Sequence, residues 1–215
     1  MNDSLTKPRR TLPFSAILIA AFAAAFGLWL GTRYFAAPSV PRLATAVMYP
    51  QPRPVPEFAL TQANGKPLTL ADWRGHWTIA YFGYANCPDV CPTTLAAFKQ
   101  VWAQLGKRGA LDKLRFDFIS VDPARDKPDV LAKYVAFFNP EFVGATGSDD
   151  ELTKLTRALG LLYTRTPTGN GDETVDHSAS TVIIDPQGRL VGMFRPPFMP
   201  PAITDDLVLL TSRGG

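Results

Sequence analysis

The two cysteines of this chain, Cys87 and Cys91, are the residues whose type and spacing offer chemistry most directly. They separate an apolar strand, 77–84, from an amphipathic helix that runs to Leu105. Pro92 suits the first helical position, which puts Cys91 at or near the N-cap. Two thiols at such a corner make a soft metal site or a redox pair. Because the positive end of the helix dipole favours thiolate, we expect a lowered thiol pKa.

Simpler explanations compete for the same pair. A structural disulfide would close only a short loop at an exposed turn, where the entropic gain is smallest. A closed zinc site needs four protein ligands, and beside the cysteines the chain has two histidines, His76 and His177. His76 follows a glycine turn, and we interpret it as a surface residue. Asp89, between the cysteines, either supports metal ligands by hydrogen bonding or merely caps the loop.

Three ordered runs of sequence point to a family. The run YFGYANCPDVCPTTL, at 81–95, closely resembles the copper-site motif of the Sco/SenC proteins, the copper chaperones of cytochrome c oxidase assembly. The runs VDPARDKPDVLAKY, at 121–134, and VDHSASTVIIDPQG, at 175–188, resemble the second and third blocks of that family. The resemblance covers roughly 56–210. In the second run we interpret Asp122 and Arg125 as an ion pair that fixes a loop.

The resemblance implies a function and a site. Cys87, Cys91 and His177 would bind one copper ion, as Cu(I) or Cu(II). The protein would deliver it to, or prepare, the binuclear copper centre of cytochrome c oxidase, as a metallochaperone rather than an enzyme. Its partners would be the copper-centre subunit of the oxidase and an upstream copper donor. The alternative is a thiol–disulfide oxidoreductase that uses Cys87 and Cys91 to reduce the cysteines of that centre or of another exported protein.

The order of predicted elements indicates the fold class. A hairpin around Asn64-Gly65 precedes two strand–helix units, a further strand and helix, a hairpin at 180–194 and a final helix at 202–210. This order predicts a thioredoxin-like α/β fold, a central mixed sheet flanked by helices. Right-handed crossovers would place the loop after strand 77–84 at the carboxyl edge of the sheet, the usual location of a site.

The N-terminal part of the sequence predicts a transmembrane helix. The uncharged run 11–32 would reach roughly 33 Å as a helix, enough for a hydrocarbon core of about 30 Å. Lys7, Arg9 and Arg10 precede it, so the positive-inside rule keeps the N-terminus cytoplasmic. The small-x-small run 44–46 lies too far from the apolar run for signal peptidase. We therefore expect an uncleaved single-pass anchor in a bacterial inner membrane, with the soluble domain in the periplasm.

These features divide the chain into four parts: a cytoplasmic tail (1–10), the membrane anchor (11–32), a proline-rich linker (33–56) and the copper-binding domain (57–215). The linker's six prolines favour an extended spacer, although an ordered strap on the domain fits its C-terminal part equally well. Residues 1–33 carry the whole formal net charge of +3. The remainder is balanced, which argues against a nucleic-acid partner.

Overall fold

The computed structural model describes residues 14–35, 43–167, 173–177 and 179–213. It divides into two compact units, 1–41 and 42–215, which are considered separately. In the first unit the described element is helix α1 (Phe14–Phe35), on which large apolar side chains such as Phe22 and Leu28 are exposed. Within the part of the chain that the structure describes, no helix combines the length and the apolar character needed to cross a membrane.

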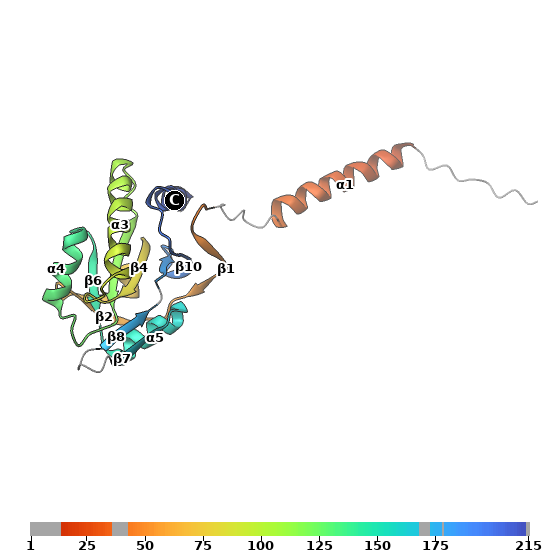
Figure 1. Ribbon diagram of the computed structural model, residues 1–215. Coiled ribbons are helices and arrows are strands. Elements are labelled where there is room, and N and C mark those ends of the chain that lie inside the picture. Colours follow the sequence, from red (N-terminus) through yellow and green to blue (C-terminus); the bar gives the residue numbers. More distant parts are fainter. Residues whose placement is uncertain (1–13, 36–42, 168–172, 178, 214–215) are drawn as a thin grey trace, which may run out of the picture. The chain divides into compact units, whose positions relative to one another are not determined.

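An eight-stranded mixed sheet forms the centre of the second unit. Its strands are β1 (Val47–Pro54), β2 (Ala59–Gln62), β3 (Pro67–Thr69), β4 (Trp77–Gly83), β5 (Leu114–Ser120), β6 (Val143–Thr146), β9 (Thr181–Ile184) and β10 (Arg189–Phe194). The order across the sheet is β1-β10-β9-β4-β5-β6-β2-β3 (Figure 1). β4, β5 and β6 run parallel, whereas the other neighbours are antiparallel. The mixed sheet that the sequence predicts is thereby confirmed.

Helices cover both faces of this sheet. They are α2 (Leu70–Trp73), α3 (Val90–Lys107), α4 (Pro128–Phe138), α5 (Asp149–Leu159) and α6 (Pro200–Arg213). On one face Phe98 of α3 stacks on Phe116 of β5, and α3 also packs against α6 (Figure 1). Asp117 points to the opposite face, because side chains alternate along a strand, and accepts a hydrogen bond from Trp73 Nε1 at 2.6 Å. The arrangement is consistent with a thioredoxin-like fold.

Local sequence signals explain where two helices begin. Pro128 opens α4, where its missing N–H removes no intrahelical bond. Ser148 caps α5 by accepting a hydrogen bond from the N–H of Glu151. Gly160 ends α5 with a φ of 71°, the left-handed conformation that glycine adopts without strain. The structure confirms the starts of both helices.

The proline-rich segment contributes an edge strand. β1 pairs antiparallel with β10, so 47–54 form the ordered strap that the sequence allows as an alternative to a spacer (Figure 1). Just before β1, the backbone N–H groups of Ala44, Thr45 and Ala46 donate to the buried carboxylate of Asp206 at 2.7–2.9 Å. The strap is therefore fixed to α6 as well as to the sheet.

A small second sheet is absent from the sequence-based prediction. β7 (Tyr163–Pro167) pairs antiparallel with β8 (Glu173–His177), and Tyr163 lies opposite His177. The sequence predicts an extended run at 161–166 but no partner strand for it. His177 therefore ends a strand of its own, two residues before the described chain resumes at Ala179 toward β9.

Candidate metal centre

The cysteine loop joins the carboxyl end of β4 to the start of α3. Cys87 closes a turn by donating its N–H to the carbonyl of Tyr84 at 3.2 Å. Helix α3 begins at Val90 with Asp89 at the N-cap position, so the expected placement of Cys91 at or near the cap is shifted by two residues. Pro92 is then the third helical residue. Proline is tolerated at this position because the N–H that it lacks would have no acceptor within the helix.

The two thiols lie together and are not joined by a disulfide. The N–H of Cys91 donates to Cys87 Sγ at 3.5 Å, so the first turn of α3 directs a backbone donor at the first sulfur. The residues themselves are buried, with 8% of Cys87 and none of Cys91 exposed. The turn itself is exposed at Asn86, Pro88 and Asp89, as expected, but the two cysteine side chains face inward.

Cys91 sits in a close-fitting cradle on β4. The hydroxyl of Tyr81 donates to Cys91 Sγ at 3.5 Å. A Cβ added to Gly83 would lie 2.7 Å from Cys91 Sγ and 3.1 Å from the ring of Phe118. Only glycine therefore leaves room for this sulfur. Tyr81 and Gly83 both lie in the motif run at 81–95, but the sequence assigns neither a role, since strand 77–84 reads simply as a buried apolar run.

Burial raises the pKa of the Cys91 thiol to about 12, and the hydrogen bond from Tyr81 offsets this only in part. The expected lowering of this thiol's pKa by the helix N-terminus is therefore wrong for Cys91 in the metal-free protein. The helix dipole acts over the first turn, but removing the sulfur from water opposes ionisation more strongly here. A metal ion that enters this site must displace a firmly held proton.

Asp89 contacts the helix rather than a thiol in the hydrogen bonds that the structure describes. Its Oδ1 accepts a hydrogen bond from the Thr93 hydroxyl at 3.4 Å, and its carbonyl accepts from the Thr93 N–H at 3.2 Å. The side chain is exposed and does not cap the helix N-terminus directly. Its support of a metal ligand stays a prediction.

The position of His177 is defined by its backbone, because its side chain lies outside the described residues. Strand β9 begins at Thr181, which pairs with Tyr81 of β4 beside the thiols. Four residues span at most about 14 Å of extended chain, so His177 stays near this edge of the sheet. Among the side chains that the structure describes, no group of three metal-ligating residues occurs. The three-ligand site therefore stays a prediction, with both thiols in place.

The other histidine lies elsewhere. His76 is exposed and precedes β4, at the end of that strand opposite to the cysteine loop. Asp122 and Arg125 form the predicted ion pair, which packs in the loop between β5 and α4. That loop also reaches the cysteine loop through Asp126, a contact that the sequence did not predict.

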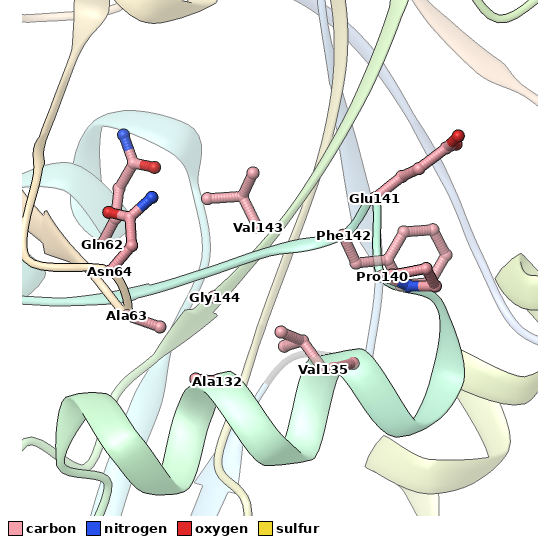
Figure 2. Close-up of a pocket in the computed structure, with 11 residues that line it drawn as sticks. Gln62, Ala63, Asn64, Ala132, Val135, Pro140, Glu141, Phe142, Val143 and Gly144 are labelled. Atoms are coloured by element: carbon pink, nitrogen blue, oxygen red, sulfur yellow. The ribbon is translucent and has the colours of Figure 1, made fainter.

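A surface hollow of the described domain lies apart from the cysteine loop. It has a volume of about 270 Å³, lies between α4, β6 and the turn after β2 and shares no residue with the cysteine loop (Figure 2). Its lining is mainly apolar, with the amides of Gln62 and Asn64, and the Glu141 carboxylate points away from Ala132 and Val135 (Figure 2). Its lining holds no Cys, His, Ser or Thr and a single carboxylate, Glu141, which is fewer groups than a catalytic or metal site requires.

Comparison with known proteins agrees with the geometry. The family model described as SCO1/SenC matches residues 48–212. A Stutzerimonas stutzeri protein described as copper-binding is 34% identical over 154 residues, 72% of this chain and 75% of that protein. The Saccharomyces cerevisiae protein SCO2, mitochondrial, is 38% identical over 136 residues. The match covers 62% of this chain but only 45% of the yeast protein.

Solved structures match the domain over most of their length. ScoI of Bradyrhizobium japonicum, with copper bound, has a TM-score of 0.67 and 36% identity, and the match covers 73% of this chain and 99% of that one. Apo Sco1 of Thermus thermophilus has a TM-score of 0.70 and 32% identity, covering 80% and 99%. The family model spans well over half of the sequence, including the cysteine loop and strands β4 to β10. The chain belongs to the SCO1/SenC family.

Proposed function

We propose that this protein is a copper metallochaperone that binds one copper ion through Cys87, Cys91 and His177. It delivers that ion to, or prepares, the binuclear copper centre of cytochrome c oxidase. The observation that carries the proposal is the pair of unbridged thiols, four residues apart, at the edge of the sheet from which the chain reaches His177 within four residues. Relatives that were solved with copper bound support the choice of metal.

The donor set suits this metal. Two thiolates and an imidazole prefer a soft ion, and Cu(I) accepts three ligands, whereas structural zinc requires a fourth. Cu(II) would add water or a carboxylate to the same residues. Burial of Cys91 means that copper replaces a proton, so the Cys91 thiol stays protonated and uncharged until the ion arrives. Copper is the cargo here and must leave again to a partner.

The test is Cu(I) competition with a chelator on the reduced protein. His177→Ala keeps both thiols but removes the imidazole, so we expect Cu(I) affinity to fall at least about 10–100-fold, the range seen when only supporting residues are lost. His76→Ala is the matched control, because this exposed histidine lies at the other end of β4. An affinity in His177→Ala equal to that of the control would remove the three-ligand site.

A thiol–disulfide oxidoreductase is the second candidate, since the two thiols are unbridged and close enough for the Cys91 N–H to contact Cys87 Sγ. The Cys87 thiolate would attack a partner disulfide and break its S–S bond, forming a mixed disulfide. The Cys91 thiol would then lose its proton to the thiolate already released by the partner and attack Cys87 Sγ, which breaks the mixed disulfide and releases the partner's second thiolate. The partner disulfide is thus reduced by two electrons while Cys87 and Cys91 are oxidised. His177→Ala should leave this activity largely intact, which separates the two functions.

We also propose that 11–32 anchor the protein in a bacterial inner membrane, with the domain in the periplasm. The sequence supports this through the uncharged run and the basic residues before it. In the domain, the small-x-small run 44–46 is bound along its backbone by the buried Asp206 carboxylate. That binding protects the run from proteolysis once the domain has folded.

A further inference from the structure

The loop between β5 and α4 lies along the first half of the cysteine loop. β4 and β5 run parallel up to the pair Gly83 and Ser120. The N–H of Val121 then donates to the Gly83 carbonyl at 2.9 Å, which extends the contact beyond the strands. The two chain segments that leave the carboxyl edge of the sheet are therefore joined from their first residues onward.

Asp126 continues this contact. It is 1% exposed, and its Oδ2 accepts hydrogen bonds from the Ala85 N–H at 2.8 Å and from the Ser120 hydroxyl at 2.5 Å. Ala85 lies two residues before Cys87. One carboxylate oxygen therefore ties the cysteine loop to the end of β5.

Arg125 makes a second contact next to the first. Its guanidinium lies 5.8 Å from the centre of the Tyr84 ring, within the range of a cation–π interaction. Asp122 holds the same guanidinium in an ion pair. Tyr84 and Ala85 are thus both held by neighbouring residues of the loop, immediately before the turn that carries Cys87.

The second carboxylate oxygen of Asp126, Oδ1, lowers the stability of the fold. Its Oδ1 is buried without a hydrogen-bond partner among the described residues, and so is the hydroxyl of Tyr134 on α4. A buried polar atom without a hydrogen-bond partner destabilises the folded state. Burial raises the pKa of Asp126, and burial together with the charges of both thiols and of Asp126 raises the pKa of Tyr134, so these groups share one small region. A buried carboxylate retained at such cost beside the thiols calls for a functional explanation.

We propose that Asp126 is a positioning residue for the metal site: by holding Ala85, its carboxylate fixes the turn that presents Cys87 to Cys91. This role deepens the proposed function, and its expected effect on copper affinity rests on that function. The hydrogen bonds of Oδ2, rather than the negative charge, perform this role. Losing them frees the turn, so Cys87 spends less time beside Cys91, and both copper affinity and disulfide stability fall.

The test compares two substitutions at one position. Asp126→Ala removes both hydrogen bonds, and we expect Cu(I) affinity to fall about 10–100-fold, as for other residues that orient metal ligands. Its Cys87–Cys91 reduction potential, measured in glutathione buffers, should rise because the disulfide closes less readily. Asp126→Asn places its amide oxygen at the Oδ2 position and its amino group where Oδ1 has no partner. It should keep both properties near those of the wild type.

Asp206→Ala is the matched control. Asp206 is equally buried and also accepts backbone N–H groups, but from 44–46 rather than from the cysteine loop. It should lower stability and leave both the copper affinity and the potential unchanged. If Asp126→Ala does not fold, Ser120→Ala removes one of the two hydrogen bonds and should shift both properties in the same direction by less.

Three results would overturn the positioning role. The first is a wild-type copper affinity and reduction potential in Asp126→Ala, or in Ser120→Ala if the former does not fold. The second is an equal change of these two properties in Asp126→Asn and Asp126→Ala. The third is an equal change in the Asp206→Ala control. The reduction potential requires no copper. A wild-type protein that failed to bind Cu(I) would therefore refute the proposed function, while the potential would still decide the role of Asp126.

Discussion

At the scale of single residues, the state of the Cys91 thiol determines how the site behaves without metal. Burial raises its pKa to about 12, whereas a free cysteine has a pKa of about 8.5. In reduced, metal-free Cys87→Ser protein, alkylation of Cys91 should therefore keep rising with pH well above about 8.5. The same variant unfolded in urea should titrate near the pKa of free cysteine. A folded-state midpoint at or below about 8.5 would contradict the dominance of burial.

Gly83 is expected to be essential to the same thiol. Gly83→Ala would place a Cβ 2.7 Å from Cys91 Sγ, so the sulfur or β4 must move. Overpacking of this kind costs about 1–3 kcal/mol, and displacement of the sulfur should also weaken Cu(I) binding. Urea unfolding and chelator competition measure the two effects.

Gly106→Ala serves as the control for Gly83→Ala. This glycine lies in α3, and an added Cβ would meet Leu111 only at 3.4 Å, an ordinary contact. It should be neutral or stabilise the helix by up to about 1 kcal/mol. Equal stability of the two variants would show that the cradle around Cys91 adapts at little cost.

The motifs and their spacing are sufficient to name Cys87, Cys91 and His177 as candidate ligands, because residue types and their order can be read from the sequence. They are not sufficient to predict Tyr81, Gly83 or Asp126. Tyr81 and Gly83 become site residues only because β4 runs beneath the start of α3. Asp126 does so because parallel pairing brings the end of β5 beside the cysteine loop. Such roles arise from tertiary contacts between distant residues.

At the scale of elements, the ordered strap depends on one carboxylate. Asp206→Ala leaves the N–H groups of 44–46 without their acceptor, and the loss of such hydrogen bonds costs about 1–3 kcal/mol. Amide exchange at these residues should accelerate strongly, while exchange in the central strand β4 should change only by the loss of global stability. Exchange at 44–46 that matched the wild type would show that pairing of β1 with β10 holds the strap without Asp206.

The predicted elements agree with the structure where local signals are strong. Pro128, Ser148 and Gly160 mark helix ends through backbone chemistry that does not depend on the rest of the fold. The sequence does not decide β1, because its prolines also favour a spacer. As an edge strand it tolerates them, since one side of its backbone has no partner strand. The sequence does not predict β8, because this short polar strand, which among the described strands pairs with β7, shows no alternation of apolar residues.

At the scale of the whole molecule, the domain is built so that one edge carries the chemistry. Tyr81, Thr181 and Phe194 lie in register across β4, β9 and β10. The start of β1 at Val47 pairs with Met193 at the same level. The cysteine loop and the start of β9, to which His177 leads, therefore lie at the carboxyl end of β4, whereas the strap bound by Asp206 lies at the same end of the sheet but is separated from β4 by β10 and β9. The position of the metal site follows from the topology of the sheet.

The last prediction concerns the orientation of the chain in a membrane. A reporter that is active only after export, fused after Gly215, should be active. In the proposed orientation Lys7, Arg9 and Arg10 keep the N-terminus in the cytoplasm while the uncharged run 11–32 crosses. Replacing these three residues by glutamate removes the positive bias and should lower export activity at equal protein level. A cytoplasmic reporter at the same site should be inactive in the unaltered chain. An inactive export reporter paired with an active cytoplasmic one would refute a periplasmic domain, and with it the delivery of copper on that side of the membrane.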